Sequence, residues 1–203
     1  IRNVFVVMGD LPYMGEYPQA TAVTDVAPSG LISLIDRANT GRNLAGHPIK
    51  YATSFLVGCA FNMSALDLDK EIRSLERKLE AGAHFILSQA VFDPKSFEYS
   101  YEKLGGFPVP LLMGLLPLNN VRHAEFLHNE VPGITIPEEI MLRMRSANPK
   151  GQPEGITIAQ ELLQEVYPKI AGVYFIPSFG KYQTVAQILN GVPNLNKRNS
   201  SSI

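Results

Sequence analysis

DLDKEIRSLERKLEAGAHFILSQAVFD, residues 67–93, is the stretch that indicates the fold most clearly. Its first half predicts a helix over residues 67–81, because leucine and isoleucine recur at helical spacing on one face. These apolar residues are Leu68, Ile72, Leu75 and Leu79. Gly82 is suited to end the helix, and the apolar run at 85–91 predicts a buried strand directly after it. A helix, a glycine turn and a buried strand in this order are typical of a parallel α/β sheet.

The rest of the chain repeats this alternation of buried strands and amphipathic helices. Further strands are predicted at 3–8, 54–60, 110–116 and 172–176. Further helices are predicted at 29–38, 94–103, 120–129, 137–146, 157–170 and 181–189. No linker marks a domain boundary, so residues 1–190 are predicted to form one domain. The polar tail 191–203 has no periodicity, and we expect it to be disordered.

Five βα units are compatible with two architectures. A doubly wound open sheet accommodates five parallel strands, whereas a closed (β/α)8 barrel needs eight strands and about 250 residues. Polar residues stand at or near the ends of four predicted strands: Asp10, Asn62, Gln89 and Asn119. Both architectures place ligands at the carboxyl ends of their strands, so the spacing alone leaves the choice open.

Composition excludes several classes of protein. The 203 residues include 18 Lys and Arg against 19 Asp and Glu, a balance that provides no field for gathering phosphates. We therefore expect neither a nucleic acid nor a membrane as partner. A single cysteine, Cys59, excludes an internal disulfide, and no apolar run approaches the roughly 18 residues that cross a bilayer. These features favour a cytoplasmic protein.

The surface of this chain is expected to be partly covered. Charged residues make up 18% of the sequence, below the usual quarter of a globular protein. A cofactor, further chain or a partner subunit, including a second copy in a homo-oligomer, would provide that cover.

The common catalytic motifs are absent from the sequence. There is no G-x-G-x-x-G after a strand, no P-loop, no H-E-x-x-H and no G-x-S-x-G. The four histidines are His47, His84, His123 and His128. None of them pairs at the spacing that places two ligands on one helix face, so no metal site is predicted.

The candidate functional residues are polar groups, and each has a simpler structural alternative. Asp10, after Gly9, is either a carboxylate at the rim of a site or the cap of a turn. Gln89 can read the edge of a heterocycle with its amide, or be a core glutamine satisfied by backbone. Arg77 and Lys78 can bind a phosphate, or belong to a solvated helix face.

Three segments of the chain carry motifs in a recognisable order. NVFVVMGDLP (3–12) is similar to a strand that ends in an (R)GD motif. LERKLEAGAHFILSQAVFD (75–93) is similar to a helix, an AGA turn and a strand that ends in a TQ-x-x-FD motif. VPLLMGLLPLNN (109–120) is similar to a P-(I/L)-x-x-G-I-(L/M)-P segment. Together these segments resemble the methylenetetrahydrofolate reductase family of flavoproteins, in family order and over almost the whole chain.

Three other segments resemble one branch of this family. They are YPQATAVTDVAPSGLI (17–32), LHNEVPGITIPEEI (127–140) and GVYFIPSFGKY (172–182). That branch comprises reductases fused behind a homocysteine methyltransferase domain and their free-standing relatives. For the fused members, the resemblance implies a fused or associated domain of that kind as a partner.

The resemblance implies a (β/α)8 TIM barrel of which this chain holds about the last five βα units. It also implies a ping-pong oxidoreductase of one-carbon and methionine metabolism. FAD takes hydride from NAD(P)H and passes it to methylenetetrahydrofolate, giving methyltetrahydrofolate. The family's general acid, a glutamate on the first strand, belongs to a region that would precede Ile1. A non-catalytic flavin- or folate-binding module or subunit without that acid is the alternative.

The resemblance also assigns site residues. Those implied to bind FAD are Met8, Gly9, Asp10, Ala22, Val23, Phe61, Glu71, Ser74, Arg77 and Lys78. Those implied to bind substrate are Gln89, His123, Leu127 and Lys181, where Gln89 binds pterin and nicotinamide in turn and Lys181 meets the glutamate tail. Asp10 and Gln89 are the implied catalytic pair. Met8 departs from the family, since many members have an arginine there.

Overall fold

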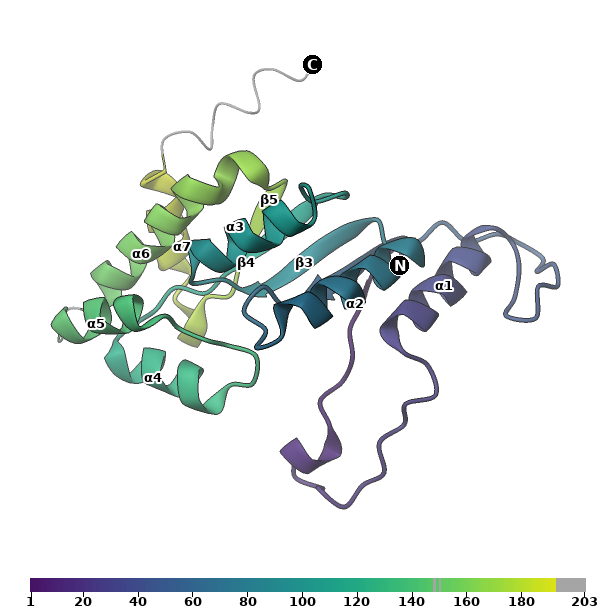
Figure 1. The fold of residues 1–203 in the computed structure, drawn as a ribbon, viewed down its shortest axis with the longest axis horizontal. Helices are drawn as coiled ribbons and strands as arrows, with labels where there is room; N and C mark the ends of the chain where they lie inside the picture. The colour runs from purple at the N-terminus through teal and green to yellow at the C-terminus, as the bar shows by residue number, and fades with distance from the viewer. Residues whose placement is uncertain (148, 150, 193–203) are drawn as a thin grey trace. The chain divides into compact units, whose positions relative to one another are not determined.

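The computed structural model describes residues 1–147, 149 and 151–192 (Figure 1). The strands are β1 (Asn3–Val6), β2 (Leu56–Phe61), β3 (Phe85–Ala90), β4 (Leu111–Leu115) and β5 (Gly172–Phe175). The α-helices are α1 (Pro28–Asn39), α2 (Leu68–Glu80), α3 (Pro94–Lys103), α4 (Val121–Glu130), α5 (Glu138–Ser146), α6 (Gly151–Val166) and α7 (Tyr182–Asn190). Short 3-10 turns are η1 (Pro12–Met14), η2 (Tyr167–Lys169) and η3 (Ser178–Gly180). The predicted tail lies outside the described residues from position 193 onward.

The strand order excludes one of the two architectures. The five described strands follow one another in the sheet in chain order, β1 to β5, and the β1/β2 and β4/β5 pairs are parallel. A doubly wound sheet reverses its order at a switch point, so this order rules that arrangement out. The chain is an α/β protein with a parallel, singly wound sheet. Within the described ranges, no helix is both long and apolar enough to cross a bilayer.

The chain divides into two compact units. The first unit comprises Ile1–Phe61 and Ile72–Ile86, and in it β1 pairs with β2 in the register Asn3 to Leu56. The predicted first strand is two residues too long, because pairing ends at Val6 and the following residues are exposed. The start of β2 is fixed by Asn39, whose side chain binds Phe55 N–H and C=O and the Thr53 hydroxyl.

The helix and turn of residues 67–84 form as predicted. Gly82 has φ +107, which favours glycine, and its N–H donates to Leu79 O at 3.0 Å. Ala83 N–H donates to Lys78 O at 3.1 Å. These two bonds make the glycine-ended cap that satisfies the last carbonyls of a helix. They end α2 at Glu80 and direct the chain into β3.

The second unit comprises Asn62–Glu71 and Leu87–Ile203. In it α5 packs against α4 and α6, and α6 packs against α7 (Figure 1). Asp93 and Asn120 cap α3 and α4 by accepting from Lys95 N–H and His123 N–H. The helix predicted at 157–170 begins at Gly151, because Gly155 fits against the Leu118 carbonyl. The sequence did not predict this first turn, because its two glycines and one proline have low helix propensity.

Candidate functional site

In the second unit, polar side chains gather at the carboxyl ends of the strands. Gln89 stands at the end of β3, Asn119 follows β4, and Ser178 follows β5. The Gln89 side chain is exposed although its neighbours Ser88 and Ala90 are buried, and it has no hydrogen-bond partner among the described residues. It is therefore not a core glutamine. An amide in this position is free to donate to and accept from a ligand.

His123, in the first turn of α4, connects two of these strand ends. It is buried, with 8% of its surface exposed, and Asn119 N–H donates to its Nδ1 at 3.2 Å. Because Nδ1 accepts, we assign the proton of the neutral ring to Nε2, which lies 3.2 Å from Ser178 Oγ. His123 thus joins the β4–α4 loop to the turn after β5.

Phe179 packs against His123 from the turn after β5. The two ring centroids lie 5.5 Å apart at an interplanar angle of 60°. Phe179 has φ 58, a left-handed conformation that is costly for a bulky residue, and 78% of its surface is exposed. A strained, exposed aromatic beside a buried histidine offers an apolar face to a ligand. Ser178 and Phe179 are not predicted as site residues from the sequence, because Ser-Phe-Gly after a strand is typical of an ordinary turn.

Lys181, just after the turn that follows β5, is close enough to His123 to act on its charge. Burial lowers the pKa of His123, and the positive charge of Lys181 lowers it further. The Lys181 ammonium also donates to Gln152 Oε1 at 3.5 Å. At neutral pH the pair therefore offers a neutral imidazole and one positive charge.

We expect His123→Gln to reduce the acid sensitivity of the fold. The pKa of His123 is lowered in the folded state, so its stabilising contribution is present above the unfolded value of about 6.5 and is lost as pH falls through the folded pKa. Urea unfolding at about pH 7.5 and about pH 5 should show a smaller loss of stability in the variant than in wild type. His47→Gln, in an exposed loop, is the control and should keep the wild-type difference. Equal losses in all three proteins would contradict the expectation.

In the first unit, the predicted phosphate-binding face of α2 divides into a buried and an exposed part. Lys78 is buried, with 8% of its surface exposed, and its Nζ donates to Ala60 O at 2.7 Å near the end of β2. Arg77 is exposed, and its side chain has no ion-pair or hydrogen-bond partner in the described part of the chain. The solvated-face alternative is therefore wrong for Lys78. The free cation of this face is the Arg77 guanidinium.

We expect Lys78→Met to destabilise the protein and Arg77→Met to leave stability nearly unchanged. Loss of Lys78 Nζ removes a charge-assisted donor from the Ala60 carbonyl, a bond worth about 1.5–3 kcal/mol. Arg77→Met should stay within about 0.5 kcal/mol, the usual range for an exposed position. Free energies of unfolding from urea titration give both values, and equal effects of the two substitutions would refute the distinction.

The other predicted site residues fall into three groups, which are exposed, buried and partly buried. Met8, Gly9, Asp10, Ala22 and Val23 are exposed in the segment after β1. Phe61 and Leu127 are buried in the core, so a ligand contact at these positions would involve their backbone. Glu71 is partly buried, and its carboxylate accepts from Asn62 N–H at 3.3 Å, just after β2.

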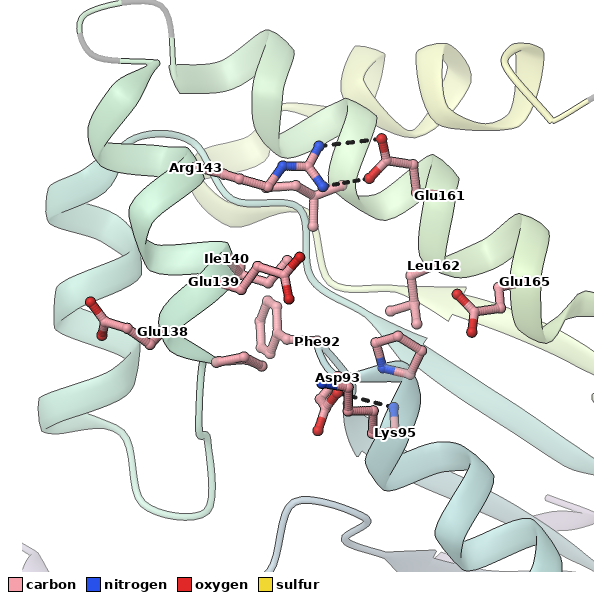
Figure 2. A pocket seen from close by; sticks show the side chains of 13 residues that line it. Phe92, Asp93, Lys95, Glu138, Glu139, Ile140, Arg143, Glu161, Leu162 and Glu165 are labelled. Atoms are coloured by element: carbon pink, nitrogen blue, oxygen red, sulfur yellow. Dashed lines mark hydrogen bonds and ion pairs between the residues drawn. The ribbon is translucent and has the colours of Figure 1, made fainter.

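A separate pocket of about 400 Å³ lies among helices of the second unit (Figure 2). It is lined by the start of α3, by α5 and by α6, and none of the predicted site residues contributes to it. Arg143 forms ion pairs there with Glu154, at 2.7 Å, and with Glu161. These ion pairs join α5 to α6.

Comparison with known proteins identifies the relatives of the chain. The family model for methylenetetrahydrofolate reductase matches residues 1–192. Methylenetetrahydrofolate reductase 2 of Schizosaccharomyces pombe is 22% identical over 98% of the chain, which spans only 32% of the length of that relative. An uncharacterized protein from Clostridium thermocellum that binds two copies of 5-methyl-5,6,7,8-tetrahydrofolic acid has a similar fold. The TM-score is 0.52 and the identity 16%, over 68% of this chain and 53% of that one.

Proposed function

Because the chain belongs to the methylenetetrahydrofolate reductase family, we propose that it is part of a flavin-dependent enzyme that reduces methylenetetrahydrofolate to methyltetrahydrofolate with NAD(P)H. The family match over residues 1–192 carries this proposal, since it includes every residue of the candidate site. In this proposal the singly wound sheet is a section of a (β/α)8 barrel, and the reaction serves one-carbon and methionine metabolism.

The exposed part of α2 fits the diphosphate of FAD. The free guanidinium of Arg77 and the partly exposed hydroxyl of Ser74 lie one helical turn apart, and both can donate to phosphate oxygens. Glu71 precedes Ser74 by another turn and would meet the adenosine portion. Lys78, held by the Ala60 carbonyl, would fix the end of β2 beside the cofactor. When bound, FAD supplies the hydride chemistry that no side chain can perform.

The segment after β1 would approach the flavin ring. Gly9 has no atom within 4 Å of the place where a Cβ would stand, so a ring can come close to its backbone. Asp10 is exposed beside it and would set the charge near the flavin and the folate. Met8, Ala22 and Val23 would supply apolar contacts, and Phe61 a backbone contact.

The strand ends of the second unit would bind the substrates. The free Gln89 amide would hold the pterin and then the nicotinamide, each of which presents adjacent donors and acceptors. The neutral ring of His123, with Phe179 packed on it, would contact the folate, as would the backbone at Leu127. The positive charge of Lys181 would meet the carboxylates of the glutamate tail.

The test uses the full-length protein that contains this chain. We expect the purified protein to show flavin absorbance, to oxidise NAD(P)H with menadione as acceptor, and to form methyltetrahydrofolate from methylenetetrahydrofolate. A colourless protein that oxidises no NAD(P)H would refute the proposal. Binding of flavin or folate without turnover would instead identify a non-catalytic binding module or subunit.

A further inference from the structure

Two side-chain hydroxyl groups hold the backbone on both sides of Gln89. The Ser88 hydroxyl donates to Gln89 O at 2.7 Å, and the Tyr174 hydroxyl, which comes from β5, donates to Ser88 O. The Ser88 carbonyl belongs to the peptide before the Cα of Gln89, and the Gln89 carbonyl to the peptide after it. Both peptide planes that border this Cα are therefore held by hydrogen bonds from side chains.

Gly114, on β4, makes this arrangement possible. Its N–H donates to Ser88 Oγ at 2.9 Å, so Ser88 accepts from β4 while it donates to Gln89 O. A Cβ on Gly114 would lie 2.9 Å from both Gln89 O and the Tyr174 oxygen. Tyr174 is the register partner of Gly114, and the missing side chain lets its hydroxyl reach past β4 to β3.

This set of contacts is buried, whereas the amide that it surrounds is not. Only 2% of the Ser88 surface is exposed, and burial raises the pKa of Tyr174, so its hydroxyl remains a donor at neutral pH. Hydrogen bonds that follow one another in a buried chain reinforce each other. The Gln89 side chain projects from this fixed backbone with no protein partner of its own among the described residues.

We propose that Ser88 and Tyr174 are positioning residues that aim the Gln89 amide at the heterocycle of the bound substrate, the pterin or the nicotinamide. The inference rests on the proposed function, in which Gln89 binds these rings in turn. A free glutamine side chain has several rotamers, so fixing its backbone limits the directions from which the amide can meet a planar edge.

Kinetics of the full-length enzyme test whether these residues act through Gln89. Ser88→Ala and Tyr174→Phe should each weaken binding of 5-methyltetrahydrofolate and lower kcat about three- to tenfold, as loss of one hydrogen bond does. Flavin content should not change, and Ser88→Thr should restore both values. Ser100→Ala is the matched control, because Ser100 is also buried and donates to a backbone carbonyl, Ser96 O, within α3.

A double-mutant cycle separates positioning from general structural support. In a Gln89→Ala background, Ser88→Ala should change folate affinity less than about twofold, because the residue that it positions is absent. An undiminished loss in that background would overturn the inference.

A readout without any ligand keeps the inference separate from the proposed function. In ¹⁵N-labelled protein, the side-chain NH₂ resonances of Gln89, assigned with Gln89→Ala, should shift or broaden in Ser88→Ala and Tyr174→Phe but not in Ser100→Ala. Unchanged resonances would refute positioning even in an active enzyme. Altered resonances in a protein that neither binds nor reduces folate would support the positioning of Gln89 and refute the proposed function.

Discussion

Under the proposed function, replacing Gln89 by alanine is expected to lower the rate of methylenetetrahydrofolate reduction about a hundredfold and to leave the fold intact. The amide has room for two hydrogen bonds to a ring edge, and the loss of two bonds of about 1.4 kcal/mol each corresponds to that factor. The side chain is exposed and has no protein partner in the described ranges, so its removal should not destabilise the protein. Steady-state kinetics of the full-length enzyme measure the effect.

Gln164→Ala provides the control for this experiment. Gln164 is an exposed glutamine near the end of α6, the helix that leads to the start of β5, and its variant should match the wild-type rate and stability. A Gln89→Ala enzyme with more than half the wild-type activity would remove Gln89 from the catalytic site. A loss of activity accompanied by a lower free energy of unfolding would point to a structural role instead.

The largest loss of stability is expected from Gly155→Ala. A Cβ at this position of α6 would lie 1.9 Å from the carbonyl oxygen of Leu118 and 2.7 Å from its carbonyl carbon. Both atoms belong to the backbone, so no rotamer change relieves the clash and α6 must move away from the loop after β4. Overpacking of this kind costs about 3 kcal/mol.

Urea unfolding of Gly155→Ala and Gly15→Ala checks this expectation. A Cβ on Gly15 would meet only Pro12 O, at 3.6 Å, and its φ of −107 suits alanine. This control should therefore stay within about 0.5 kcal/mol of wild type. A loss below about 1 kcal/mol in Gly155→Ala would show that α6 is not held against Leu118 as tightly as the structure indicates.

The sequence predicted those features that depend on neighbouring residues. Apolar spacing and Gly82 correctly delimited α2 and β3, and capping residues such as Asp93 lie at the predicted helix starts. The start of α6 was not predicted, because Gly151 and Gly155 are needed for close contact with Asn120 and Leu118. These two partners are distant in the sequence.

Features that depend on the meeting of separate elements could not be predicted in this way. The contacts of Ser178 and Phe179 with His123 join residues more than 50 positions apart. The burial of Lys78 could not be predicted either. The charged face of α2 does not indicate which of its cations binds a backbone carbonyl of a neighbouring strand. The family resemblance supplied functional roles for residues, but it did not show which of them the fold itself uses.

Asn39 has a consequence for how this fold can change in evolution. Its side chain joins the end of α1 to the start of β2. Within the loop that connects these two elements, an antiparallel bridge between Arg42 and Pro48 closes a smaller loop. Residues inserted at 43–47 would therefore extend a loop whose ends are already closed. Each doubling of such a loop costs only about 0.6 kcal/mol. The tip at 43–47 is thus a place where this chain can gain an additional segment without disturbing β2.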